Sequence, residues 1–418
     1  MSATYSSGPR PPGSRGSVGR AAGATPVPSA TRHTGTRRPG SKSANAERVQ
    51  VFVVCTPGLE QLTLAEVTRQ GIANPKALHG GIAGAATWPQ MWSLNLHVRT
   101  ATRILVRVAR FESERFDSLQ RVLRAIDWAA WLPTERGLRV SVTSSGSKLF
   151  HTDAVAERVL DVVPHEEDSP DDEPVNELFL RIIDNDVTVS LNTSGDPLYR
   201  RGWRTEVGKA PMRETLAAAL ILSSGWDGKA PLVDPFCGSG TIPIEAALIS
   251  RRVPPGRHRQ FGFMDWPTFD SVRWERLLAA GDADVLDRAV VIVGSDRDEG
   301  AIAAATANAG RAGVGDAVSF TAQSVSALEP PSARNGWLVT NPPYGHRVGD
   351  DDLRNLYDRF AGVLNTKFAG WNLGIVNSET SPPLKVSLAD PSSTITSNGG
   401  IPITLRSGRV TGGSVESR

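Results

Sequence analysis

The chain has 418 residues, of which 39% are hydrophobic and 22% are charged, and its formal net charge is +2. This is the composition of a soluble globular protein of two or three domains, and no apolar stretch or signal-peptide core points to a membrane or to secretion, so we expect a cytoplasmic protein. The two cysteines, Cys55 and Cys237, and the seven histidines lack the spacing of a disulfide framework or a metal site, so we expect no metal.

Residues 1–48 differ in composition from the rest of the chain. They consist mostly of Gly, Ser, Pro, Ala and Thr with interspersed arginines, and the first acidic residue is Glu47. Such a segment cannot bury enough apolar surface to offset the entropy lost on ordering, so we predict a disordered basic tail. Dispersed arginines suit a non-specific RNA tether, and an organellar transit peptide or a solubilising tail has the same composition.

Residues 49–204 alternate between strand-like and helix-like patterns. The alternation is typical of an α+β module rather than of a series of βαβ units. The patterns predict strands over 49–56, 99–111 and 137–145, helices over 57–71, 118–132 and 152–163, and two strands over 177–195 that turn about Asn185 and Asp186.

Two charged stretches of this region are open to a functional interpretation. Residues 164–174 form an acidic, proline-bounded run, which predicts an exposed loop because the alternating ligands of a calcium loop are missing. Arg99, Arg103, Arg107 and Arg110 interleave with apolar residues in the strand 99–111. This second pattern fits an RNA-binding face and an ordinary exposed sheet face equally well.

Beyond residue 204, strands alternate with helices, which predicts a parallel, doubly wound Rossmann-like sheet. Ligands of such sheets bind at the carboxyl edge, near the point where the strand order reverses. The last part, 384–418, is poor in helix signal and suggests a hairpin and a frayed end. The patterns predict helices over 209–226, 241–250, 299–314 and 351–368, and strands over 231–236, 289–298, 317–324, 337–344 and 371–378.

The first loop at that edge, DPFCGSGT, spans residues 234–241. A strand ends at Asp234, and Gly238 and Gly240 let the backbone pass close beneath a ligand and open a helix. The glycine spacing does not fit a dinucleotide fingerprint, and the Lys of a nucleotide-phosphate loop is missing. S-adenosylmethionine fits better, with Asp296 at the next strand tip accepting from the ribose hydroxyls and Asp234 from the ammonium group.

The motif NPPY, residues 341–344, ends the strand that begins at Trp337. An exocyclic amine is a poor nucleophile because its lone pair is delocalised into the ring. The side-chain oxygen of Asn341 and the carbonyl of Pro342 offer two acceptors for the amino hydrogens, and the prolines hold the backbone rigid. Tyr344 offers a flat face on which an extruded base can stack. The sequence therefore predicts methylation of a planar nitrogen.

These motifs, together with SGDPLYRRGWR, APMRETLAAALILSSGW and SNGGIPI, resemble the THUMP-containing RNA guanine-N2 methyltransferases over about residues 51–404. The similarity is greatest to the catalytic domain that methylates bacterial large-subunit ribosomal RNA. It implies a ferredoxin-like and THUMP-type RNA-binding region over 49–204, then a seven-stranded methyltransferase domain over 205–410 with a reversed last strand. It also implies S-adenosylmethionine as cofactor, RNA as partner and, in our expectation, a monomer.

The resemblance assigns site residues by position. Asn341, Pro342, Pro343 and Tyr344 would hold the target base. One position departs from the family, because Gln323 and Ser324 stand where an acidic residue usually accepts from the adenine amine. The residues assigned to the cofactor are Arg213, Glu214, Thr215, Asp234, Phe236, Cys237, Gly238, Ser239, Gly240, Thr241, Asp296, Arg297, Gln323, Ser324 and Asn341.

The NPPY corner specifies an sp2-bound nitrogen and not a particular base. The resemblance favours guanine-N2 in large-subunit ribosomal RNA, followed by guanine-N2 in tRNA and, more distantly, adenine in DNA. A non-catalytic RNA-binding or ribosome-assembly factor that retains the fold is an alternative of another class. The intact corner argues against that alternative, and the missing acid near Gln323 argues for it.

Overall fold

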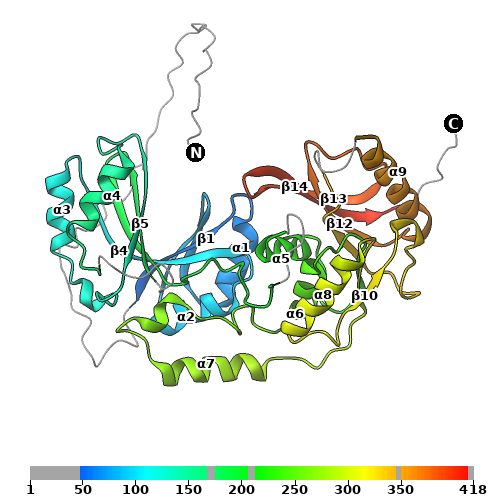
Figure 1. Cartoon of the computed structure of the whole chain (residues 1–418), viewed down its shortest axis with the longest axis horizontal. Helices are drawn as coiled ribbons and strands as arrows, with labels where there is room; N and C mark the ends of the chain where they lie inside the picture. The colour runs from blue at the N-terminus through cyan, green and yellow to red at the C-terminus, as the bar shows by residue number, and fades with distance from the viewer. Residues whose placement is uncertain (1–47, 167–174, 206–211, 345–349, 413–418) are drawn as a thin grey trace, which may run out of the picture. The chain divides into compact units, whose positions relative to one another are not determined.

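The computed structural model describes residues 48–166, 175–205, 212–344 and 350–412. The tail predicted over 1–48, except for its last residue, and most of the acidic run 164–174 lie outside the described residues. The described chain forms two seven-stranded sheets, one from its first half and one from its second (Figure 1). In the described ranges no helix combines the length and apolar character needed to span a bilayer.

The first sheet has the strand order β2-β3-β1-β4-β7-β6-β5. Neighbouring strands are antiparallel except for β5 and β6, which are parallel, as an α+β module allows. Its strands are β1 (Val49–Cys55), β2 (Ala73–Leu78), β3 (Gly81–Ala86), β4 (Ala101–Glu112), β5 (Leu138–Ser145), β6 (Asn176–Ile183) and β7 (Asp186–Asn192). The helices of this region are α1 (Glu60–Arg69), α2 (Trp88–His97), α3 (Phe116–Arg124) and α4 (Thr152–Leu160), with a 3-10 turn at Trp128–Ala130.

The turn between β6 and β7 lies one residue earlier than the sequence analysis placed it. Ile183 pairs with Asp186, so the turn residues are Asp184 and Asn185, with φ of 49° and 67°. Positive φ at both positions is what a type I′ hairpin turn requires, and Asp and Asn tolerate it better than most residues. Asp186 is therefore the first residue of β7 and not part of the turn.

The sequence patterns did not predict β2, β3 or α2. β2 reads ANPKAL and β3 reads GIAGAA, and such segments lack the β-branched and aromatic residues that mark strands. α2 begins at a capping box in which Thr87 and Gln90 each accept from the other's backbone N–H. The capping box was the available sequence signal for this helix.

The second sheet has the strand order β10-β9-β8-β11-β12-β14-β13, and β8 to β12 are parallel. β14 runs antiparallel to both β12 and β13, which confirms the Rossmann-like sheet with a reversed last strand. Its strands are β8 (Leu232–Asp234), β9 (Ile292–Asp296), β10 (Ser319–Ala322), β11 (Trp337–Thr340), β12 (Asn372–Ser378), β13 (Leu388–Asn398) and β14 (Ile401–Val410). The helices are α5 (Glu214–Ser223), α6 (Thr241–Ser250), α7 (Ser271–Ala283), α8 (Glu299–Arg311) and α9 (Asp350–Lys367), with 3-10 turns at Gly262–Asp265 and Val325–Ala327.

Alternating residues of the central strands bury the two faces of this sheet separately. Leu232 and Val339 pack in a cluster with residues of α5, α6 and α8, whereas their neighbours Val233 and Leu338 pack with residues of α9. Successive side chains of a strand point to opposite faces, so each short strand supplies both layers. Helices on both faces leave the strand ends as the place where a ligand can bind.

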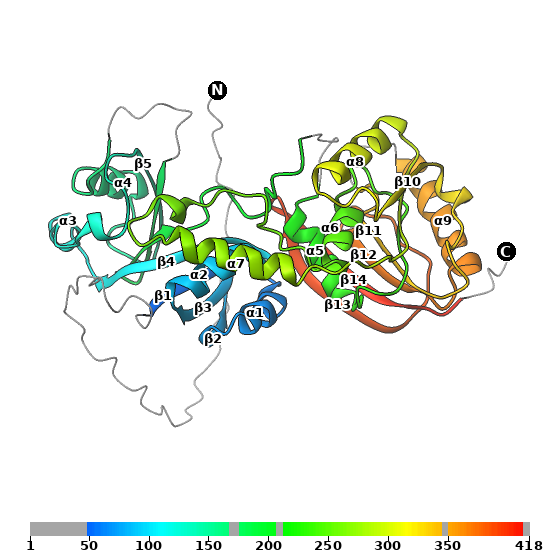
Figure 2. The ribbon, with the colours of Figure 1, turned by 90° about the horizontal axis from the view of Figure 1, so that it is seen from below.

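The insertion 251–288 packs against the first half of the chain. Phe261, Phe263 and Trp274 belong to the same buried cluster as Trp92 of α2, and the rings of Trp92 and Phe263 stack with centroids 6.0 Å apart. Figure 2 shows α7 lying along α2, and the two helices are in contact. This insertion therefore completes the core of the first sheet, although it lies between strands of the second in sequence.

Candidate active site

A cavity of about 1260 Å³ lies at the carboxyl ends of four parallel strands. Asp234 ends β8, Asp296 ends β9, and Gln323 and Asn341 directly follow β10 and β11, and all four line the cavity. The strand order changes direction between β8 and β11. The cavity thus occupies the switch point at which open α/β sheets bind ligands.

Asp234 is a buried carboxyl group in the cavity wall, with 1% of its surface exposed. Its Oδ1 accepts from the hydroxyl of Thr340, at 2.6 Å, and from the backbone N–H of Phe236, at 3.1 Å. Burial raises the pKa of Asp234 from 3.8 to about 7, although both hydrogen bonds favour the carboxylate. A cation in the cavity would therefore interact strongly with this group.

Glycine is needed at positions 238 and 240 of the loop for different structural reasons. Gly238 lines the cavity with φ of 50°, and a Cβ built on it would meet nothing within 4 Å. Gly240 caps α6 with φ of 87°, and a Cβ there would lie 3.0 Å from the Cβ of Ala305. Gly238 therefore keeps the cavity floor open, whereas Gly240 allows the tight turn and the close packing of α6 on α8.

Asp296 connects the β8 and β9 loops. Its Oδ2 accepts from the backbone N–H of Gly238, at 3.1 Å, and its Oδ1 from that of Asp298, also at 3.1 Å. Asp298 in turn caps the N-terminus of α8 through the N–H groups of Gly300 and Ala301. The carboxylate of Asp296 is thereby oriented at the cavity edge, where each oxygen retains a lone pair for a further donor.

The corner after β11 presents an acceptor to which none of the described residues donates. Asn341 lines the cavity, and its Oδ1 is shielded from solvent and has no hydrogen-bond partner in the described ranges. The corner is held from outside, because the hydroxyl of Tyr357 on α9 donates to the carbonyl of Pro343 at 3.3 Å. Burying an acceptor without a partner costs free energy, so a ligand that donates a hydrogen bond to Oδ1 would recover this cost.

Most residues predicted from the sequence meet in this cavity. Glu214, Thr215 and Gly240 do not line it. The predicted residues that line it are Arg213, Asp234, Phe236, Cys237, Gly238, Ser239, Thr241, Asp296, Arg297, Gln323, Ser324, Asn341, Pro342, Pro343 and Tyr344.

Glu214 has a different environment from the one predicted. It is buried, its Oε1 lies 3.2 Å from Nε of Arg204, and burial raises its pKa to about 6. Arg204 also donates to the carbonyl of Met212 and to the hydroxyl of Thr241. Met212 and Thr241 both line the cavity. Glu214 thus acts on the cavity wall through Arg204 and does not face the cavity.

Sequence reasoning missed lining residues from several elements, including α8 and the 3-10 turn Val325–Ala327, and the hairpin and α9 are the most distant in sequence from the predicted motifs. The hairpin of β13 and β14 contributes Asn398, Gly399 and Ile401, and α9 contributes residues that include Asn355 and Arg359. The hairpin itself was predicted from its Asn-Gly-Gly signal, but its position at the cavity depends on the sheet order. Nothing in the local pattern of α9 distinguishes the side chains that face the cavity.

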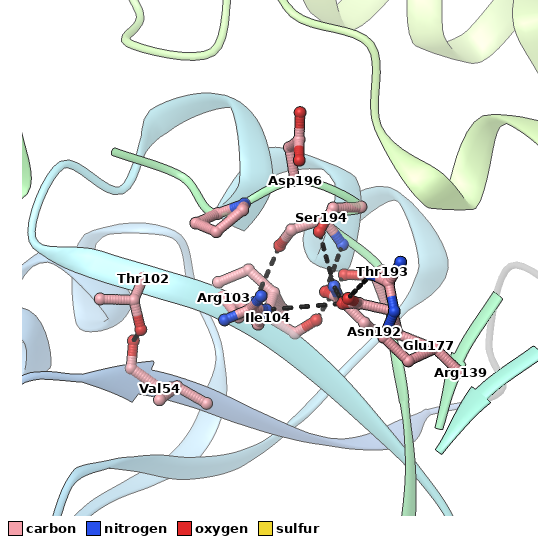
Figure 3. Close-up of polar contacts among 12 residues, drawn as sticks. Val54, Thr102, Arg103, Ile104, Arg139, Glu177, Asn192, Thr193, Ser194 and Asp196 are labelled. Atoms are coloured by element: carbon pink, nitrogen blue, oxygen red, sulfur yellow. Dashed lines mark hydrogen bonds and ion pairs between the residues drawn. The ribbon is translucent and has the colours of Figure 1, made fainter. Parts of the chain in front are cut away.

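The arginines in and before β4 are engaged within the protein. The side chain of Arg99 is 11% exposed and donates to the carbonyls of Leu248 and Val253, so it does not belong to an exposed RNA-binding face. Arg103 lies 3.6 Å from a carboxylate oxygen of Glu177, next to Arg139 and Asn192 (Figure 3). These contacts agree with a structural role for the arginine pattern.

Comparison with known proteins identifies the family. A family profile described as "RMKL-like, methyltransferase domain" matches residues 201–406, and one described as "RlmL ferredoxin-like domain" matches residues 50–105. A putative RNA methyltransferase of Synechocystis is 31% identical over 380 residues, which cover 88% of this chain and 98% of that protein. The chain belongs to the RMKL-like methyltransferase family. The second profile confirms the expected ferredoxin-like fold for residues 50–105, whereas the THUMP assignment and the bounds 49–204 stay predictions.

Other relatives of this family member are longer. The ribosomal RNA large subunit methyltransferase K/L of Psychromonas ingrahamii is 33% identical over 348 residues, which cover 79% of this chain and 46% of that protein. The protein of the same name from Marinomonas is 31% identical over 84% of this chain and 51% of its own length. This chain therefore spans about half the length of these relatives.

Two solved structures share the fold over most of the chain. SMU.472, a putative methyltransferase complexed with SAH, has a TM-score of 0.78 and 26% identity and covers 88% of this chain and 100% of its own. A predicted N6-adenine-specific DNA methylase from Listeria monocytogenes has a TM-score of 0.76 and 27% identity, with coverages of 88% and 98%. Both support the methyltransferase fold that the strand order shows.

Proposed function

We propose that this RMKL-like methyltransferase uses S-adenosylmethionine to methylate the N2 amine of a guanine in large-subunit ribosomal RNA. The observation that carries the proposal is the buried Oδ1 of Asn341, which lines the cavity together with the glycine loop and has no hydrogen-bond partner among the residues that the structure describes. Native proteins satisfy nearly all buried acceptors, so one without a partner at a cavity is best explained by a ligand donor. An exocyclic amine is such a donor.

The cavity fits S-adenosylmethionine in charge and size. Asp234 offers a carboxylate to the ammonium group, and Asp296 offers lone pairs to a ribose diol. The N-terminus of α6 begins at Gly240 and favours a negative charge such as the cofactor carboxylate. When bound, the cofactor supplies a methyl group activated by its sulfonium. About 1260 Å³ leaves room for a base beside it.

The corner residues would activate the amine by orienting it. The Oδ1 of Asn341 and the carbonyl of Pro342 accept the two amino hydrogens, which turns the nitrogen lone pair out of conjugation with the ring. Tyr344 stacks on the base. The proton leaves after nitrogen has become cationic, so the site needs no strong general base. Adjacent prolines hold both acceptors in place before the reaction.

The relatives' names support RNA as the substrate, and ribosomal RNA in particular. The corner alone does not separate guanine-N2 from adenine-N6, and one structural neighbour carries the name of an adenine methylase. Guanine-N2 in tRNA and a non-catalytic RNA-binding role are the alternatives, and each predicts a different result in the experiments below.

The first experiment asks whether the cofactor binds and which nucleoside is formed. Calorimetric titration with S-adenosylmethionine should give a binding isotherm, and no heat would favour the non-catalytic role. Mass mapping of nucleosides from a deletion strain should show loss of one N2-methylguanosine from large-subunit ribosomal RNA. Loss from tRNA, or of N6-methyladenine from DNA, would replace the proposed substrate by that one.

The second experiment tests the role of Asn341. Asn341→Ala should lower turnover at least about 100-fold, because an oriented acceptor in a desolvated site has an effect of this size. The affinity for SAH, measured by calorimetry, should stay within about 3-fold, since the lost oxygen faces the base. Asn335→Ala, at an exposed asparagine of the loop before β11, is the matched control and should change neither quantity. A large loss of SAH affinity in Asn341→Ala would contradict this role.

A further inference from the structure

The tip of the β13–β14 hairpin has a geometry that its sequence dictates. Asn398 pairs with Ile401, which leaves Gly399 and Gly400 as a two-residue turn. Their φ values of 59° and 89° are those of a type I′ turn, in which both positions need a left-handed backbone. A Cβ on either glycine would meet nothing within 4 Å, so the glycines serve the turn and not the packing.

The hairpin is anchored in the sheet, so its tip has a defined position. β14 pairs with β12 from Asn372 and Arg409 to Ser378 and Ile403, and Ile403 is buried in the core. Beyond that last pair with β12, only two residues of β14 separate the sheet from the turn. Asn398 and Ile401 therefore stand at a fixed height above the carboxyl ends of the strands, where both line the cavity.

The side chain of Asn398 reaches the catalytic corner. Its Nδ2 donates to the hydroxyl oxygen of Tyr344 at 3.1 Å, across a separation of 54 residues in sequence. Tyr344 directly follows Pro343, whose carbonyl is held by Tyr357. Tyr357 of α9 thus fixes the main chain before the ring, and Asn398 of the hairpin fixes the hydroxyl end of the ring.

The place of this hydrogen bond on the ring determines what it controls. The hydroxyl of a tyrosine lies on the axis that runs from Cβ through the ring, so a bond there fixes the direction of that axis and hence χ1. Three staggered χ1 rotamers are otherwise available to an aromatic side chain at the edge of a cavity. The hydrogen bond therefore keeps the axis of the Tyr344 ring in the cavity that Asn341 also lines.

We propose that Asn398 is a positioning residue, which holds the Tyr344 ring in the orientation on which the target base stacks. The inference rests on the proposed function in one respect, the stacking role of Tyr344. It adds a third element, the β13–β14 hairpin, to the glycine loop and the NPPY corner that bind cofactor and substrate in the proposed function.

The test is a double-mutant cycle of Asn398→Ala and Tyr344→Phe. The Tyr344→Phe variant retains the ring and removes the hydroxyl. Each single variant should lower kcat for methylation of ribosomal RNA from a deletion strain by roughly 3- to 10-fold, the usual effect of one neutral hydrogen bond. The double variant should be no slower than either single variant, because both remove the same bond. KM for S-adenosylmethionine should not change.

Two further variants give the cycle its controls. Tyr344→Ala removes the stacking face and should be slower than Tyr344→Phe, since base stacking on an aromatic ring contributes more than the hydrogen bond. Ser393→Ala changes an exposed residue of β13 away from the tip and should behave as the wild type. A variant that merely loosened the hairpin would lower the melting temperature without the non-additive kinetics.

The outcomes separate this inference from the proposed function. If the wild type transfers no methyl group to any RNA, the proposed function fails. If the wild type is active and Tyr344→Ala is impaired, but Asn398→Ala or Tyr344→Phe is as fast as the wild type, only the positioning role is overturned. Additive losses in the double variant would also overturn it. Should Asn398→Ala fail to fold, Tyr344→Phe alone tests the same hydrogen bond.

Discussion

At the scale of single residues, Asp234 combines nearly complete burial with a place in the cavity wall. Its exposure of 1% explains why its pKa rises to about 7 despite the hydrogen bonds from Thr340 and from the backbone of Phe236. Desolvation by burial is the dominant effect on this pKa, and the nearby charge of Asp296 raises it further. The group is therefore poised to ionise when a cation enters.

The raised pKa of Asp234 predicts a pH dependence of stability. Between about pH 4 and pH 7 the folded protein keeps a proton that the unfolded chain loses, so its free energy of unfolding falls as pH rises through this window. Asp234→Asn cannot ionise, so the stability of the variant relative to the wild type should rise across the same window, from about pH 4 to about pH 7, as measured by urea unfolding without ligand. Burial also raises the pKa of Glu214. Because the wild type and Asp234→Asn share this group, its contribution cancels when their stabilities are compared.

Asp227 provides the contrasting control for this measurement. It is exposed and accepts from the backbone N–H groups of Lys229 and Ala230, and these hydrogen bonds help to lower its pKa. Asp227→Asn should therefore lose stability relative to the wild type as pH rises, the opposite direction to Asp234→Asn. Equal pH dependence in the wild type and Asp234→Asn would contradict the buried, protonated carboxyl.

At the scale of elements, the loop between β8 and α6 shows how one motif serves two purposes. Gly238 faces the open cavity, whereas a Cβ on Gly240 would meet Ala305 of α8 and Phe320 of β10. Both have positive φ, but only Gly240 lacks space for a side chain. The sequence shows two glycines, and the packing around them assigns their roles.

Alanine substitutions at these glycines should separate binding from stability. Gly240→Ala combines a left-handed backbone with a Cβ contact of 3.0 Å, so we expect a loss of roughly 2–4 kcal/mol of unfolding free energy. Gly238→Ala carries the backbone cost alone, about 1–2 kcal/mol, and places a methyl group in the cavity. Urea unfolding and SAH titration should show Gly240→Ala as the less stable variant and Gly238→Ala as the weaker binder. The reverse order would contradict the assignment.

At the scale of the whole described chain, a buried ionic cluster joins its two halves. Glu245 of α6 is 0% exposed and lies 3.2 Å from Arg201 and 3.7 Å from Arg99, which precedes β4. Arg201 also donates to the carbonyls of Leu198 and Arg99. Because these guanidinium groups are largely desolvated, the carboxylate is needed to balance them.

Removal of this carboxylate should be strongly destabilising. Glu245→Ala leaves two buried guanidinium groups without their carboxylate, and we expect a loss of roughly 3–5 kcal/mol in urea unfolding. Asp351→Ala breaks an exposed pair with Arg354, whose side chains are 93% and 69% exposed, and should cost less than about 1 kcal/mol. Similar losses in the two variants would show that the buried cluster contributes no more than a surface pair.

Much of the second sheet could be predicted from the sequence because its elements are marked locally. The predicted strands 231–236 and 337–344 have apolar runs that end at polar residues, and the structure contains β8 and β11 within those ranges. The predicted helix 241–250, which follows the glycine loop, is α6. The first half was harder to predict, because β2 and β3 carry weak strand signals and are stabilised by their neighbours in the sheet. The short helix α2 was missed although its capping box is visible at Thr87.

Local sequence was enough to predict the alternation of strands and helices, the carboxyl-edge position of Asp234, Asp296 and Asn341, and the NPPY corner, since these depend on neighbours within a few residues. Three contacts could be found only in the folded chain, namely that Glu214 faces Arg204, that the insertion 251–288 fills the core of the first sheet, and that Asn398 meets Tyr344. Such contacts join residues of different elements, for example Asn398 and Tyr344, which are 54 positions apart. Their formation depends on strand order and on burial of the whole chain, which no local pattern encodes.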